Sequence, residues 1–77
     1  MKTSPDQLVF ILIETGILDI GSQKALAQKM KRAESTIGNW RTGKTAMPTP
    51  DFLMLFSWYR GDSLVASVFE ETLKTLQ

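Results

Sequence analysis

The sequence predicts an all-α protein, a compact domain of five short helices that spans residues 1–77. Apolar residues recur at intervals of three and four, which places them on one face of a helix, and no stretch alternates with the period of two typical of a strand. Capping residues with a nearby proline stand where helices would begin, and glycines stand where they would end. We therefore expect helices joined by short loops, with no internal repeat and no low-complexity linker.

The first helix is expected to begin at Pro5. Ser4 can cap it, proline is favoured at the first helical position, and Gln7 is placed to close a capping box. Gly16 is expected to end this helix. Residues 8–13 are apolar on every side, which predicts a helix that is buried on more than one face or shared with another subunit. This run is far too short to span a bilayer.

A second helix is expected over residues 23–30, after a connection formed by residues 17–21. Ser22 is its cap. Leu26 and Met30 lie four apart and form a narrow apolar stripe, with a small alanine beside them, so the helix contacts the rest of the protein along one side only. The side chains expected to face water or a partner are Gln23, Lys24, Gln28 and Lys29.

A third short helix is expected from Glu34 to about Arg41, and Gly43 ends it. Ile37 and Trp40 lie three apart and share the inward face of this helix. The outward face then carries only short or polar side chains. These are Glu34, Ser35, Thr36 and Asn39.

Two further helices are expected in the last third of the chain. Residues 49–51, Thr-Pro-Asp, repeat the order of cap, proline and acid at the start of a helix that Gly61 ends. The fifth helix, residues 62–76, is capped by Asp62 or Ser63 and is a candidate dimerisation element. Its spacing leaves open which residue of each neighbouring pair faces inward. The candidates are Leu64 or Val65, Val68 or Phe69, Thr72 or Leu73, and Leu76.

Positive charge is concentrated in the middle of the chain. Residues 22–45 hold six cations and one acid, a net +5, although the whole chain carries only +1. Residues 1–21 and 46–77 each carry −2. A basic face is the electrostatic feature expected of a nucleic-acid-binding protein, and the alternative is an ordinary solvated helical surface. The cations are Lys24, Lys29, Lys31, Arg32, Arg41 and Lys44.

The second and third helices have the lengths and the tight connection of a helix-turn-helix motif, over about residues 22–43. A helix with a short, polar outer face can enter the major groove of double-stranded DNA and bond to base edges there. The run SQKALAQKMKRAESTIGNWRTGK, residues 22–44, resembles the Cro/CI-type (lambda-repressor-like) helix-turn-helix family. The residues that carry the resemblance are Ser22-Gln23, Leu26-Ala27, Ser35-Thr36-Ile37, Trp40 and Gly43-Lys44. The proline in the following loop and the further helix after it also fit the family, which extends the resemblance loosely to about Arg60.

The resemblance implies a transcriptional regulator, more often a repressor and of phage or mobile-element type, that binds a palindromic operator as a homodimer. It implies base contacts from Glu34, Ser35, Thr36 and Asn39. It also implies phosphate contacts from Gln23 and near Arg41 and Lys44. Three cations beside the motif complete the predicted phosphate-binding set, and they are Lys24, Lys31 and Arg32.

Two residues depart from the family pattern. Lys31 stands in the turn where the family usually has glycine, and a non-glycine residue in a left-handed conformation costs about 1 kcal/mol. Ala33 stands where the family usually has serine or threonine as the cap of the reading helix, and this loses roughly another 1 kcal/mol. Both departures are small enough for a domain to tolerate.

Enzymatic chemistry is not expected. The chain has no cysteine and no histidine, which excludes disulfides, Cys/His zinc sites and thiol nucleophiles. The carboxylates are scattered, and Glu70 and Glu71 are adjacent on a helix instead of facing each other. Residues 38–45, GNWRTGKT, match the phosphate-loop spacing, but they lack the preceding strand and the helix that opens at the lysine. We expect no cofactor and no metal.

The second hypothesis is a protein-binding regulator, such as a small antirepressor or adaptor on the same scaffold. Residues 52–59, FLMLFSWY, are apolar or aromatic at all but one position, which is more than so small a domain easily buries alone. A homodimer interface is the other explanation. Trp40 and Trp58 are predicted to be core residues, not platforms for base stacking. The N-terminus does not resemble a signal peptide, so we expect a cytoplasmic protein with no membrane partner.

Overall fold

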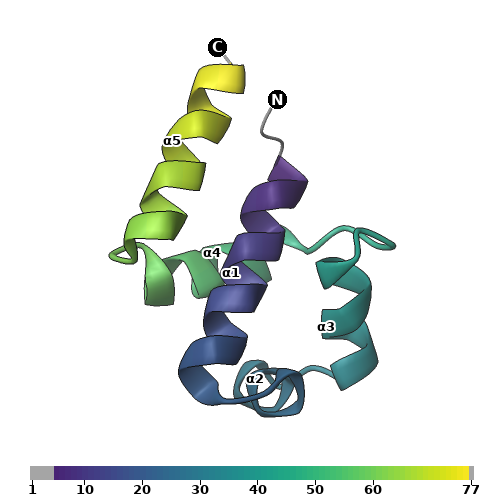
Figure 1. The fold of residues 1–77 in the computed structure, drawn as a ribbon. Coiled ribbons are helices and arrows are strands. Elements are labelled where there is room, and N and C mark those ends of the chain that lie inside the picture. The colour runs from purple at the N-terminus through teal and green to yellow at the C-terminus, as the bar shows by residue number, and fades with distance from the viewer. Residues whose placement is uncertain (1–4, 77) are drawn as a thin grey trace.

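The computed structural model describes residues 5–76, and these residues form five α-helices and no strand (Figure 1). The prediction of an all-α fold is confirmed. The helices are α1 (Pro5–Ile20), α2 (Gln23–Met30), α3 (Glu34–Arg41), α4 (Thr49–Tyr59) and α5 (Ser63–Leu76). Helix α1 lies at the centre and packs against each of the other four, and its first turns lie beside the end of α5 (Figure 1).

The core is one cluster of buried apolar side chains that draws on all five helices. Ile37 and Trp40 are both buried, so the predicted inward face of α3 is confirmed. The apolar stripe predicted for α2 is confirmed in the same way. The members of the cluster are Leu8, Leu12, Ile13, Leu26, Ala27, Met30, Ile37, Trp40, Leu55, Tyr59 and Val65.

Helix α1 continues past Gly16 to Ile20, so the prediction that Gly16 ends the helix was wrong, as was the connection predicted over residues 17–21. The glycine has a packing role instead. A Cβ atom at Gly16 would lie 3.0 Å from one methyl carbon of Leu26 and 3.5 Å from Tyr59. Glycine inside a helix costs about 1 kcal/mol, and the close approach of α2 to α1 offsets this cost. The chain leaves the helix at Gly21, which has φ +121°.

The ends of the remaining helices refine the sequence predictions. Ser22 caps α2, because its Oγ accepts a hydrogen bond from Ala25 N at 3.0 Å. Pro48 is the cap of α4 and Thr49 is already helical, so the cap predicted at Thr49 was wrong by one residue. Asp62 caps α5, since its Oδ1 accepts hydrogen bonds from the backbone N–H groups of Leu64 and Val65. The predicted cap at Ser4 lies outside the described residues.

In α5 the structure shows, for most of the residue pairs that the sequence spacing left open, which residue faces inward. Val65 and Thr72 are buried, whereas Leu64 and Leu73 are exposed. Val68 and Phe69 are both half-buried, and Phe69 packs on Phe56 of α4 with ring centroids 4.8 Å apart. The side chain of Leu76 lies outside the part that the structure describes. The helix therefore uses one stripe for the core and leaves two leucines uncovered.

The two tryptophans differ in their surroundings. Trp40 is a core residue, as predicted. Trp58 is only half-buried and lies at the edge of the core, where Lys29 Nζ is 4.7 Å from its ring centroid. Trp58 packs against the core without being one of its fully buried members, so the prediction that it belongs to the core is confirmed only in part. No helix within residues 5–76 has the length and apolar character needed to cross a membrane.

Tyr59 joins the end of α4 to the end of α1 and makes stability depend on pH. Its hydroxyl donates to Asp19 Oδ2 at 3.1 Å. Burial, together with this hydrogen bond and the charge of Asp19, raises the pKa of Tyr59 to about 12. An unfolded tyrosine has a pKa near 10, so the folded state holds the proton more tightly.

We expect the free energy of unfolding to fall between pH 10 and pH 12, because the contribution of Tyr59 is complete below pH 10 and lost above pH 12. Urea unfolding of the wild type and of Tyr59→Phe at a series of pH values tests this. The difference between the two proteins at each pH is the informative quantity, because it isolates the contribution of the Tyr59 hydroxyl. Identical pH dependence in both proteins would contradict the assignment.

Candidate nucleic-acid interface

Helices α2 and α3 are joined by only three residues, 31–33. Helix α2 ends in the reciprocal backbone pattern of a Schellman motif: Arg32 N–H donates to the Ala27 carbonyl at 2.9 Å, and Lys31 N–H donates to the Gln28 carbonyl at 3.1 Å. Lys31 has φ 59° and ψ 43°, the left-handed conformation. The strained turn residue predicted from the sequence is therefore confirmed.

Replacing Lys31 with glycine is expected to stabilise the protein by about 0.5–1 kcal/mol. Glycine removes the penalty of about 1 kcal/mol for the left-handed conformation. It also raises the conformational entropy of the unfolded chain, which offsets part of this stabilisation. Urea unfolding measures the change. Lys24→Gly is the matched control, because Lys24 is exposed inside α2 and glycine there is expected to destabilise by about 1 kcal/mol. A destabilised Lys31→Gly protein would contradict the prediction.

Helix α3 separates a buried face from an open one. Ile37 is fully buried, while Glu34 and Ser35 are exposed, and Thr36 and Asn39 are half-buried. Ala33 precedes the helix without any side-chain cap, as the sequence predicted. The four outward side chains make no hydrogen bond or ion pair to any described residue, so their polar groups are available to a partner.

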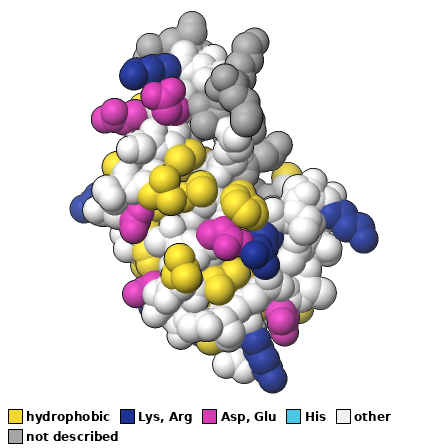
Figure 2. Space-filling model, in the orientation of Figure 1, with side chains coloured by type: hydrophobic (Ala, Val, Ile, Leu, Met, Phe, Trp, Pro, Cys, Tyr) yellow, Lys and Arg dark blue, Asp and Glu magenta, His cyan; other side chains and the backbone are white. Residues whose placement is uncertain are grey.

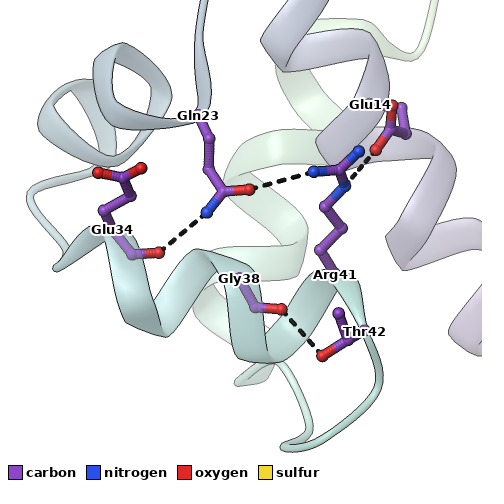
Figure 3. A network of polar contacts seen from close by, with 6 residues as sticks. All are labelled: Glu14, Gln23, Glu34, Gly38, Arg41 and Thr42. Atoms are coloured by element: carbon purple, nitrogen blue, oxygen red, sulfur yellow. Dashed lines mark hydrogen bonds and ion pairs between the residues drawn. The ribbon is translucent and has the colours of Figure 1, made fainter.

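A network of polar contacts connects α3 to α1 and α2 (Figure 3). Gln23, the first residue of α2, donates from Nε2 to the Glu34 backbone carbonyl at 3.3 Å and accepts at Oε1 from Arg41 Nη1 at 3.3 Å. Arg41 Nε forms an ion pair with Glu14 Oε1 on α1. The network therefore holds both ends of α3, one against α2 and the other against α1.

Gly38 makes room for this network in the middle of α3. A Cβ atom at this position would lie 3.2 Å from Gln23 Nε2, which is tighter than ordinary contact. The Gly38 carbonyl accepts from Thr42 Oγ1 at 3.0 Å, so the last turn of the helix is also satisfied (Figure 3). The absence of a side chain at residue 38 lets the amide of Gln23 lie directly over the helix.

The predicted phosphate-binding residues fall into two groups. The first group is exposed and forms no ion pair with a described residue: Lys24, Lys31 and Lys44. The second group holds internal partners: Gln23, Arg32 and Arg41. Phosphate binding by either group stays a prediction, but only in the first group is the side chain held by no hydrogen bond or ion pair to a described residue.

Arg32 is held by Asp51 in the first turn of α4. Its Nε and Nη2 atoms each donate to one carboxylate oxygen of Asp51 at 3.1 Å. The Asp51 side chain is 4% exposed, whereas that of Arg32 is 47% exposed. This bidentate pair fixes the turn between α2 and α3 on α4.

Sequence reasoning missed Glu14 and the role of Asp51. Glu14 lies in a run of apolar residues, and nothing in the local pattern links it to an arginine on α3. Asp51 fits the acid expected in the first turn of a helix, which explained the residue without any ion pair. The only signal was that each is a single charge close to an apolar segment, and such a charge needs a partner if it is buried.

A second surface feature lies at the junction of α1, α4 and α5. It is a shallow cavity of about 440 Å³ lined in part by Asp19, Tyr59 and Asp62. Leu18, 85% exposed, and Leu64, 54% exposed, also line it. Within residues 5–76 no group of three acidic side chains is arranged to hold a metal ion.

Comparison with known proteins adds no assignment. Neither a family model nor a curated protein nor a solved structure matches the chain significantly. The resemblance of residues 22–44 to one family of helix-turn-helix motifs therefore stays a prediction from those residues alone.

Proposed function

We propose that the protein is a helix-turn-helix regulator of transcription, most simply a repressor, that binds double-stranded DNA in a sequence-specific manner as a homodimer. In this proposal α2 and α3 form the helix-turn-helix and α3 is the reading helix. The observation that carries the proposal is the open face of α3, whose outward side chains are exposed or half-buried and make no hydrogen bond or ion pair to a described residue. Buried Ile37 and Trp40 fix that face outward.

The chemistry of this face suits the edges of bases. Asn39 offers a donor and an acceptor that together match an adenine edge, and Ser35 or Thr36 can bond to a base or contact a thymine methyl group. Glu34 can accept from a cytosine amino group. Exposed Lys24, as well as Lys31 and Lys44, would supply phosphate contacts.

A dimer would place two copies of α3 in successive major grooves about 34 Å apart. Exposed Leu64 and Leu73 on α5 support the earlier assignment of residues 62–76 as a candidate dimerisation element. Three free lysines per subunit give about six phosphate contacts, so the logarithm of the binding constant should fall against the logarithm of salt concentration with a slope of about −5.

Selection of duplexes from a random pool with the purified protein tests the proposal. Recovery of a palindrome, with binding that weakens at the expected slope in a salt series, would support it. Failure to enrich any sequence, together with no binding to duplex DNA at low salt, would overturn it.

The second candidate function is capture of another protein by an apolar surface. Exposed hydrophobic side chains favour it, and Figure 2 shows hydrophobic side chains gathered on the middle of one face. Over the whole described surface, on whichever face they lie, the large exposed hydrophobic residues are Phe10, Leu18, Leu53, Leu64 and Leu73. An apolar protein complex should respond little to added salt, so the same salt series separates this function from DNA binding.

A further inference from the structure

Arg41 is the arginine of α3, yet its charge is directed toward the protein. Its Nε atom forms an ion pair with Glu14 Oε1, and its Nη1 atom donates to Gln23 at 3.3 Å (Figure 3). The Glu14 oxygen in the pair is itself buried and accepts no hydrogen bond from a described residue, so its contact with Arg41 is an ion pair alone. The two side chains are 39% and 31% exposed, so neither is freely solvated.

A carboxylate in contact with a guanidinium cancels most of its charge as seen by a second anion. A phosphate that approaches Arg41 would have to displace Glu14 or accept a site that is close to neutral. Salt screens a partly buried pair less than an exposed one, so the competition persists at physiological ionic strength. Glu14 thus acts on Arg41 as an internal substitute for a phosphate group.

The same pair also affects the orientation of α3. Arg41 donates to Oε1 of Gln23, which leaves Nε2 of the same amide to bond to the Glu34 carbonyl at the start of α3. If Arg41 turned outward to a phosphate, this amide would lose the contact that sets its direction. The ion pair between Arg41 and Glu14 therefore also helps to keep the outward face of α3 in position.

We propose that Glu14 is a specificity-determining residue: it withholds Arg41 from the phosphates and so keeps affinity for any duplex low relative to affinity for the preferred sequence. This inference rests on the proposed function. Glu14 acts through Arg41 and touches no nucleic acid, so it is a positioning residue. Non-specific binding is mainly electrostatic, and selectivity in a genome depends on the ratio of the two affinities.

Glu14→Gln keeps the size of the side chain and removes its charge. Each subunit then gains one available cation, and the dimer gains two. The salt slope for a random duplex should steepen by about 1.8, and affinity for that duplex at low salt should rise by about tenfold. The preferred duplex should gain less, because the released Arg41 no longer orients Gln23 and α3.

A four-protein cycle tests the coupling: wild type, Glu14→Gln, Arg41→Gln and the double variant, each titrated with a random duplex over a salt series. The inference requires that Glu14→Gln steepen the slope only where Arg41 is present. Loss of a remote negative charge would act equally in both backgrounds. Glu70→Gln is the matched control, since Glu70 is an exposed carboxylate on α5.

The outcomes separate the two proposals. If the wild type binds no duplex at low salt, the proposed function fails. If the wild type binds but the slope of Glu14→Gln is unchanged, or changes equally without Arg41, the inference fails alone. If Glu14→Gln does not fold, the Arg41 Nε–Hε resonance of the wild type gives the answer. It should stay in place on titration with random duplex, and a large shift would overturn the inference.

Discussion

Arg32→Met is expected to destabilise the protein by about 3 kcal/mol, considerably more than Asp51→Asn. Loss of the arginine leaves a carboxylate that is 4% exposed without its partner. Breaking a fully buried ion pair in this way costs about 3–5 kcal/mol, and we expect the lower end of this range because the pair is only part-buried and the positive end of α4 lies next to Asp51. Asp51→Asn leaves Arg32, which is 47% exposed and can turn into water, so we expect a loss of only about 1 kcal/mol.

Urea unfolding of both variants measures the asymmetry, and Lys24→Met is the control for removal of an exposed cation. Equal losses at the two positions would show that the pair contributes as a surface ion pair does. The experiment also bears on function. Because Arg32 is committed to Asp51, we expect Arg32→Met to leave the salt dependence of duplex binding unchanged, in contrast to Lys31→Met.

Local sequence signals predicted the elements whose ends are set by local contacts. Helix α2 has the predicted bounds because Ser22 bonds to the backbone at its start and the turn at Lys31 closes its end. The inward side of α3 followed from the three-residue spacing of Ile37 and Trp40 in the same way. These features depend on residues within a few positions of each other.

The errors arose where a distant contact outweighed a local preference. Gly16 favours a helix end by about 1 kcal/mol, but the packing of Leu26 against it keeps α1 continuous. Trp58 has the spacing of a core residue and packs against the core, yet it is only half-buried, with Lys29 over its ring. In both cases the deciding residue lies on another helix, and a periodicity argument does not include it.

The candidate site divides along the same line. The outward side chains of α3 were predicted from the sequence because they are what remains once the inward face is fixed. The partners of Arg32 and Arg41 were not, since Asp51 and Glu14 are 19 and 27 positions away along the chain. Charge counting therefore found a basic segment but overestimated how much of its charge is free.

The largest functional effect is expected from replacing Ser35, Thr36 and Asn39 together with alanine. Each base contact contributes about 1–3 kcal/mol to discrimination, so affinity for the selected duplex should fall at least about 100-fold, to the level of a random duplex. Affinity for the random duplex and its salt slope should stay unchanged, because the phosphate contacts come from other residues.

The fold should tolerate this triple change. The three side chains make no bond to the described part of the protein, and alanine is a better helix former than any of them. Thermal unfolding is therefore expected at the wild-type temperature or slightly above it. A control protein with Ser57, Ser67 and Thr75 replaced by alanine removes three exposed polar residues from α4 and α5, and it should keep full sequence preference. If the α3 variant instead retained its preference for the selected duplex, bases would be read elsewhere, and the open face of α3 would lose the role proposed for it.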